Sequence, residues 1–242
     1  MVKARIYSYL LKLGLRDKQR LLRLLAKIEF GVAIFCFKLQ RQAIAESKHN
    51  LASMLEAHGR EESKHGKMLA SLADGWERIS LTETGQWVAM FRPSGEQIAK
   101  PIIDNPTTIK TITWDSIKFP GERLIGLFEN FDGISKRYFS ARVLFKNRDA
   151  ADYPWEDKLA FMYVLEEETA KLYSEMSRLD DPKISAIAQQ VTEDEFNHAN
   201  YLKRSLAEFS PLPEAAIDKW RNRVWWARWG LVVDLIRFLM KA

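Results

Sequence analysis

The sequence predicts an all-α fold in which two helical hairpins are separated by a long insertion and flanked by further helices at both termini. Apolar residues recur at helical spacing in both hairpin regions, and each region has a polar turn signal near its middle. Each second helix also carries a Glu-x-x-His motif. We therefore expect one domain, residues 1–242, made of a hairpin at 17–73, an insertion at 74–156, a hairpin at 157–209 and a C-terminal amphipathic helix at 214–241.

The composition is typical of a single intracellular domain. A chain of 242 residues is long enough to bury a large core. Its one cysteine, Cys36, excludes a disulfide framework and is typical of a reducing compartment. Lys3, Arg5 and Lys12 interrupt the apolar N-terminal residues, and no small-residue cleavage site follows them. We therefore expect no signal peptide and a cytoplasmic location.

Two Glu-x-x-His motifs are the strongest functional signal in the sequence. A Glu and a His three residues apart leave the same face of a helix. A further Glu precedes each motif, by 33 residues in the first hairpin and by 29 in the second, which brings it level with the motif once the hairpin folds. Two such hairpins would bring four carboxylates and two imidazoles to one point, which is the ligand set of a carboxylate-bridged di-iron site. The candidate metal ligands are Glu29, Glu62, His65, Glu166, Glu195 and His198.

Turn signals support this pairing and argue against a third copy of the motif. The midpoint of the second pair falls at 180–181, inside Leu179-Asp180-Asp181-Pro182, where Asp favours a turn and Pro favours the first turn of a helix. The midpoint of the first pair falls just before the polar cluster at 47–50. The third copy, from Glu46 to His49, therefore lies at a predicted turn, and we do not expect it to bind metal.

The four candidate acids lie on apolar helix faces. Burying an ionised carboxylate is costly unless it is paired or binds a metal, so these positions require cations. The alternative is that they are exposed glutamates of charged helices, which is the usual location of a Glu. Agreement of spacing, turns and faces favours the metal site. In the run 166–168, Glu168 also has apolar neighbours, but we prefer Glu166 for its even spacing to Glu195.

Two further residues lie close to the predicted ligands. His58 precedes Glu62 by one helical turn on the same face, and we favour a role beside the ligands or at the surface over a role as a ligand. Tyr173 follows Glu166 by seven residues and is the candidate catalytic residue, as a redox or hydrogen-bonding group. Plain core packing is the favoured alternative for Tyr173.

The order Glu, Glu-x-x-His, long connection, Glu, Glu-x-x-His resembles the ferritin-like di-iron carboxylate superfamily. Residues 166–202 are similar to the second hairpin of rubrerythrin-like proteins and of cyanobacterial aldehyde-deformylating oxygenases. The resemblance covers 20–73 and 157–207, and it implies a ferritin-like four-helix bundle with two iron ions, or manganese in their place. The implied roles are bridging for Glu62 and Glu195, terminal for Glu29 and Glu166, and one imidazole per metal for His65 and His198.

The resemblance implies an oxidoreductase that activates O2 or peroxide, and departures from the family narrow the class. With one cysteine the chain lacks a four-cysteine rubredoxin module, so electrons would come from an external donor. Leu69 stands where the radical subunit of ribonucleotide reductase has a tyrosine. The alternatives are a rubrerythrin-type peroxidase or oxidase and a non-enzymatic, membrane-associated metal-binding protein. A homodimer is compatible with each.

Both termini are basic and apolar. Residues 1–27 carry eight Lys or Arg and one Asp, and residues 219–242 carry six and one, so the middle of this +5 chain is acidic. The C-terminal run is too charged to span a membrane, but it suits a bilayer interface and hence a lipid-like or other hydrophobic substrate. The alternative is a fifth helix with its tryptophans in the core. The apolar density argues against nucleic acid as a partner. The tryptophans are Trp220, Trp225, Trp226 and Trp229.

The insertion at 74–156 carries the weakest pattern. Pro93, Pro101, Pro106 and Pro120 punctuate an irregular stretch of it, with one strand-like piece at 108–114 and a helical pattern from 122 to 145. It could cover a substrate pocket, dock a reductase or pack across the helices.

Overall fold

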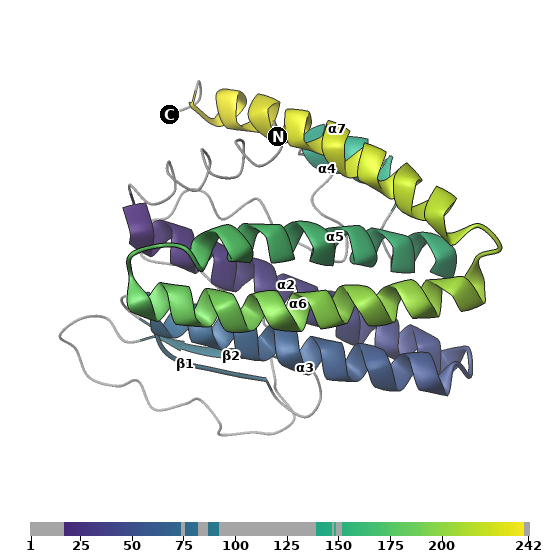
Figure 1. Cartoon of the computed structure of the whole chain (residues 1–242), viewed down its shortest axis with the longest axis horizontal. Helices are drawn as coiled ribbons and strands as arrows, with labels where there is room; N and C mark the ends of the chain where they lie inside the picture. The colour runs from purple at the N-terminus through teal and green to yellow at the C-terminus, as the bar shows by residue number, and fades with distance from the viewer. Residues whose placement is uncertain are drawn as a thin grey trace.

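The computed structural model describes residues 17–73, 76–81, 87–91, 139–146, 148 and 152–239 (Figure 1). These residues are predominantly helical, which confirms the predicted all-α class, with one antiparallel pair of short strands as an exception. In chain order the elements are α2 (Lys18–Ala45), α3 (His49–Ser71), β1 (Trp76–Leu81), β2 (Trp87–Phe91), α4 (Phe139–Phe145), α5 (Trp155–Met176), α6 (Pro182–Phe209) and α7 (Pro213–Leu239).

A tight turn at 46–48 joins α2 to α3. Ser47 has a φ of 59°, which lies in the left-handed region and reverses the chain. The backbone N–H of Lys48 then donates to the carbonyl of Ala43 at 2.8 Å. Glu46 and His49 of the third motif therefore lie at the turn, and both are exposed.

A second turn, at 177–181, joins α5 to α6. The Asp181 side chain accepts hydrogen bonds from the backbone N–H groups of Lys183 and Ile184, and Pro182 occupies the first helical position. Lys18 at the start of α2 also pairs with Asp181 at 2.6 Å. The start of the first hairpin is thus tied to the turn of the second.

The four helices α2, α3, α5 and α6 lie side by side (Figure 1). Two apolar clusters pack between them, and one of these clusters extends to α4 and α7. One cluster, which includes Leu51 and Leu159, lies toward the α2–α3 turn. The other, which includes Leu69 and Ile184, lies toward the α5–α6 turn. The buried glutamates and histidines occupy the sequence positions between these two clusters.

Helix α7 packs along α5 through a buried aromatic and a buried acid. Trp220 is 1% exposed and lies against Phe145, Tyr153 and Phe161. Its indole N–H donates to Asp157 at 2.8 Å, and Lys219 pairs with the same carboxylate oxygen at 2.5 Å. These contacts fix the start of α7 on the outer face of α5.

The other tryptophans of α7 face away from the core. Trp225, Trp226 and Trp229 are 39%, 59% and 57% exposed, whereas Trp220 is buried as the fifth-helix alternative expects. Among the described residues, no helix combines the length and the apolar character that crossing a membrane requires.

The structure describes only parts of the insertion. The β1–β2 hairpin is not among the predicted elements, although Gly85 between two short apolar runs is a usable hairpin signal. Helix α4 corresponds to the end of the predicted helical pattern at 122–145. The remainder of that pattern, the strand-like piece at 108–114 and residues 1–16 lie outside the described residues.

Candidate metal centre

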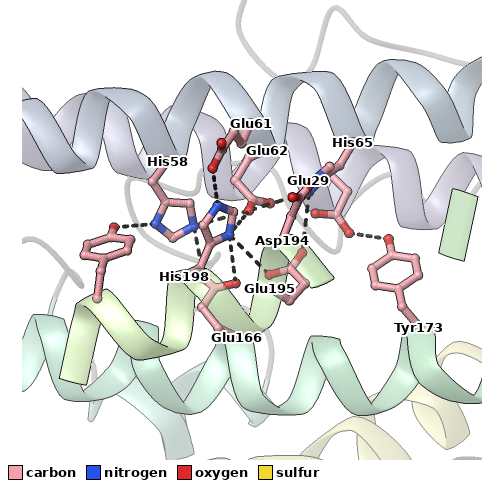
Figure 2. Close-up of polar contacts among 11 residues, drawn as sticks. Glu29, His58, Glu61, Glu62, His65, Glu166, Tyr173, Asp194, Glu195 and His198 are labelled. Atoms are coloured by element: carbon pink, nitrogen blue, oxygen red, sulfur yellow. Dashed lines mark hydrogen bonds and ion pairs between the residues drawn. The ribbon is translucent and has the colours of Figure 1, made fainter. Parts of the chain in front are cut away.

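All six predicted metal ligands come together between the four long helices (Figure 2). Helix α2 contributes one of them, α3 two, α5 one and α6 two. Each of the six residues is at most 2% exposed. They are Glu29, Glu62, His65, Glu166, Glu195 and His198.

The ligand atoms form two groups that share Glu62. In each group, one side-chain atom from every member lies within 4.8 Å of the others. Each oxygen of Glu195 also faces one of the two motif imidazoles. Oε1 lies 3.5 Å from His65 Nδ1, and Oε2 lies 3.5 Å from His198 Nδ1. Two carboxylates thus lie between the two groups. The first group is Glu29, Glu62, His65 and Glu195, and the second is His58, Glu62, Glu166 and His198.

The structure distinguishes the adjacent glutamates of α5. Glu166 is 1% exposed, and its Oε2 lies 3.9 Å from His198 Nδ1. Glu168 instead points toward the outside, where it pairs with Lys171 at 3.1 Å and with Arg228 of α7. Glu166 is therefore the member of this run that lies in the centre.

His58 is a member of the centre that the sequence reasoning did not favour as a ligand. A surface location is wrong, since the residue is 1% exposed. Its Nε2 lies 3.2 Å from Glu62 Oε1 and 3.4 Å from Glu166 Oε1. The sequence feature that indicates this location is the position of His58 one turn before Glu62, because both residues lie on the buried face of α3.

Two acids outside the predicted set orient the motif histidines. Asp194 lies 3.0 Å from Nε2 of His65, and Glu61 lies 2.6 Å from Nε2 of His198. Each acid directly precedes the motif Glu of one hairpin and contacts the histidine of the other. Such outer carboxylates fix the tautomer and the ring orientation of a histidine, and here they leave Nδ1 facing the centre.

Tyr173 lies at the edge of the centre next to Glu29. The side chain is fully buried, and its hydroxyl donates to Glu29 Oε1 (Figure 2). Burial raises the pKa of Tyr173 well above its usual value, and the charge of Glu29 raises it further. The tyrosine hydroxyl therefore keeps its proton and donates a hydrogen bond to the Glu29 carboxylate.

The concentration of buried acids in the centre shifts the pKa values of its glutamates and histidines. Burial raises the pKa of Glu29 and of Glu166, and the charge of Glu195 adds to both shifts. Burial opposes charge on His65 as well, but the nearby carboxylates of Glu195 and Glu62 outweigh it and raise the pKa of His65 to about 12. The same balance raises the pKa of His198 to about 11. The carboxylates thus draw positive charge to their neighbours.

Several buried ligand atoms have no hydrogen-bond partner, which matches the requirement of a metal site. Among the residues that the structure describes, no Lys or Arg pairs with any of the four glutamates at the centre. Unpaired buried polar atoms are rare and costly in proteins, and bound cations satisfy such groups. The residues present therefore fit divalent metal. The atoms without a hydrogen-bond partner are His58 Nε2, Glu62 Oε1, His65 Nδ1, Glu166 Oε1, both carboxylate oxygens of Glu195, and His198 Nδ1.

Two glycines allow α3 to approach α2 closely beside the centre. A Cβ on Gly66 would lie 2.5 Å from the ring of Phe30, and one on Gly59 would lie 3.0 Å from the ring of Phe37. The glycines are seven residues apart on α3, with Glu62 between them. Because these positions lack a side chain, α3 packs close to α2 and Glu62 lies near Glu29.

The third Glu-x-x-His motif takes no part in the centre. Glu46 accepts hydrogen bonds from Lys48 and from the Trp155 indole, each at 2.6 Å. These bonds lower the pKa of Glu46 to about 2. The motif is therefore part of a surface turn, as its position in the sequence predicts.

Comparison of the chain with models of known protein families, with curated proteins and with solved structures finds no match. The functional argument therefore depends on the geometry of the centre itself.

Proposed function

We propose that this chain is a ferritin-like protein whose four long helices hold a carboxylate-bridged di-iron centre, and that it is a non-haem oxidoreductase acting on O2 or peroxide. The observation that carries the proposal is the set of buried, mutually facing ligand atoms that have no hydrogen-bond partner. Carboxylate ligands suit manganese, and imidazole suits iron. We favour iron because imidazole accompanies carboxylate in both groups.

The geometry supports distinct roles for the ligands. Glu62 belongs to both groups and Glu195 faces both motif histidines, so we propose that these two carboxylates bridge the metals. Glu29 and Glu166 each belong to one group and would bind terminally. A pair of iron ions held by these residues would supply the redox chemistry toward O2 or peroxide. Because the sole cysteine, Cys36, is buried, a separate electron donor would reduce the centre.

The remaining residues orient the ligands and control protons. Asp194 and Glu61 keep the Nε2 protons of His65 and His198, so that Nδ1 of each ring is free to bind. Tyr173 keeps its hydroxyl proton, and the hydrogen bond that it donates to Glu29 holds that carboxylate in place. The apolar clusters on both sides of the centre exclude water from it.

Helix α7 supports a second element of the proposal, contact with an anionic lipid surface. Trp225, Trp226 and Trp229 are exposed, and residues 219–242 carry six Lys or Arg against one Asp. Exposed tryptophan together with basic charge favours the interface of an anionic bilayer. The substrate class that such a location suits is lipid-like or otherwise hydrophobic.

Ferrous loading of anaerobically prepared protein tests the oxidoreductase. We expect about two irons per chain by metal analysis, as the two ligand groups require. We further expect O2 consumption on exposure to air. His65→Ala and His198→Ala are expected to lose both properties, and the matched control His49→Ala, which changes an exposed histidine at the start of α3, is expected to keep them.

The outcomes separate the alternatives. Turnover with H2O2 in the absence of an organic substrate would favour a rubrerythrin-type peroxidase. Stoichiometric metal without O2 consumption would favour a non-enzymatic metal-binding protein. Absence of stoichiometric metal would overturn the proposal.

Vesicle flotation tests the lipid contact. Full-length protein is expected to float with vesicles that contain phosphatidylserine, and Trp226→Ser with Trp229→Ser is expected to reduce this binding. Ile44→Ser is the matched control, since Ile44 is 50% exposed on α2. Equal binding by all three proteins would remove α7 as the contact.

A further inference from the structure

His58 presents an unused ligand atom to the centre. Its Nε2 is buried, has no hydrogen-bond partner and lies 3.2 Å from Glu62 Oε1 and 3.4 Å from Glu166 Oε1. A buried imidazole nitrogen that faces two carboxylates without a hydrogen bond to either is the arrangement of a metal ligand rather than of a packed core histidine.

Contacts on the other side of the His58 ring fix this orientation. Nδ1 forms a hydrogen bond of 2.6 Å with the hydroxyl of Tyr201 on α6. The ring also stacks on His198, with centroids 3.9 Å apart and an angle of 30° between the planes. Because Nδ1 is occupied by Tyr201, Nε2 is the atom left for the centre. Tyr201 thus orients the ring of His58 by bonding one of its nitrogens, as Asp194 and Glu61 orient the two motif histidines.

With His58 included, the two ligand groups differ in chemistry. The group around His58 has two imidazoles and two carboxylates, whereas the group around His65 has one imidazole and three carboxylates. Imidazole-rich sets bind later first-row divalent ions such as Co²⁺ and Zn²⁺ more tightly, and carboxylate-rich sets suit Mn²⁺. The difference follows from which residues face each position.

We propose that His58 is a third imidazole ligand, and that the two metal positions are inequivalent: a nitrogen-rich position at His58, Glu62, Glu166 and His198, and an oxygen-rich position at Glu29, Glu62, His65 and Glu195. This inference depends on the metal centre proposed above. The nitrogen-rich position fills first when Co²⁺ is added to metal-free protein. A mixture of Co²⁺ and Mn²⁺ therefore gives a mixed-metal centre.

Co²⁺ titration of the metal-free full-length protein tests the inference through visible absorption and calorimetry. Wild-type protein is expected to bind Co²⁺ in two resolved steps. His58→Ala is expected to lose the tighter step and keep the weaker one, whereas His49→Ala is expected to keep both. Tyr201→Phe retains the ring but removes the hydrogen bond to His58, and we expect it to weaken the tighter step by about 10- to 100-fold. Circular dichroism checks that each variant is folded.

Each result has a distinct meaning. Two steps in wild-type protein, with the tighter one weakened in Tyr201→Phe and lost in folded His58→Ala, support the inference. If wild-type protein binds two Co²⁺ ions and folded His58→Ala and Tyr201→Phe bind them unchanged, His58 is not a ligand and the inference is overturned while the metal centre stands. If Tyr201→Phe is unchanged and His58→Ala does not fold, the inference is likewise overturned. If wild-type protein binds no Co²⁺ stoichiometrically, both the inference and the metal centre are overturned.

Discussion

The acidic residues on the two faces of α5 differ in whether a basic side chain pairs with them. On its outer face, Glu167 accepts two hydrogen bonds from the Arg221 guanidinium, at 2.8 and 3.2 Å, and Glu168 pairs with Arg228. On its inner face, the adjacent Glu166 lies among three other buried glutamates without a Lys or Arg partner among the described residues. Consecutive residues of one helical turn thus include two acids that pair with Arg and one acid, Glu166, that faces only histidines and other acids.

This difference identifies which acids are kept for a bound cation. The chain supplies a basic residue to each acid of α5 that contacts α7, including Asp157 with Lys219. Its failure to do so at the centre is therefore not a shortage of Lys and Arg, of which it has 37. Buried carboxylates left without such partners are retained at a cost in stability, and metal binding is the function that explains the cost.

Glu62→Gln is the change with the largest expected effect on the inner face. Glu62 belongs to both ligand groups, so we expect the variant to lose both metal ions rather than one. Metal analysis after ferrous loading measures the result. Glu167→Gln on the outer face of α5 is the control and is expected to keep both ions. Full metal content in Glu62→Gln would contradict the shared role.

Asp157→Ala is the change with the largest expected effect on the outer face. It leaves the buried indole N–H of Trp220 and the ammonium group of Lys219 without their partner. We expect a loss of about 2–3 kcal/mol in the free energy of unfolding, at the low end for a buried pair because Lys219 is half-exposed. Urea denaturation of the metal-free protein measures it. A loss of the same size in Lys219→Met would assign the effect to the ion pair alone.

Glu166→Gln and Glu167→Gln are expected to change the stability of the metal-free protein in opposite directions. Burial and the charge of Glu195 raise the pKa of Glu166, so this carboxyl group destabilises the fold at neutral pH and the neutral amide should add about 1 kcal/mol. Glu167→Gln weakens a surface pair with Arg221 and should cost up to about 1 kcal/mol. Equal signs in urea denaturation would contradict the comparison.

Acid should reveal a smaller contribution from Glu46, a paired acid outside the centre. Hydrogen bonds from Lys48 and Trp155 lower its pKa to about 2 in the folded chain, from an ordinary value of 4.5. The stability that Glu46 adds is therefore present above pH 4.5 and is lost as the pH falls toward 2. Solvent screening keeps the effect below about 1 kcal/mol. The difference in urea midpoint between wild-type protein and Glu46→Gln should shrink between pH 6 and pH 3.

The sequence contains enough information to bring Glu29, Glu62, Glu166 and the two motif histidines to one place. Helical spacing and hairpin turns are local properties, and they determine which side chains share a face. His58 was placed on the correct face, but its partner Tyr201 comes from α6, and contacts between hairpins are not visible in local periodicity.

Two other residues were missed although a signal was present. Glu61 and Asp194 each stand directly before a motif Glu, so the full pattern in both hairpins is acid-Glu-x-x-His. The pattern does not reveal that each acid contacts the histidine of the opposite hairpin, because that crossing depends on how α3 packs against α6. The exposure of Trp225 beside the burial of Trp220 likewise depends on the docking of α7.

The measurement that tests the central claim most directly is an anomalous diffraction map at the iron edge from crystals of anaerobically iron-loaded protein. We predict two iron peaks between α2, α3, α5 and α6, both in contact with Glu62, and Nε2 of His58 bound to one of them. Absence of peaks at the centre, or peaks confined to surface acids such as Glu46, would contradict the claim that these buried carboxylates are metal ligands.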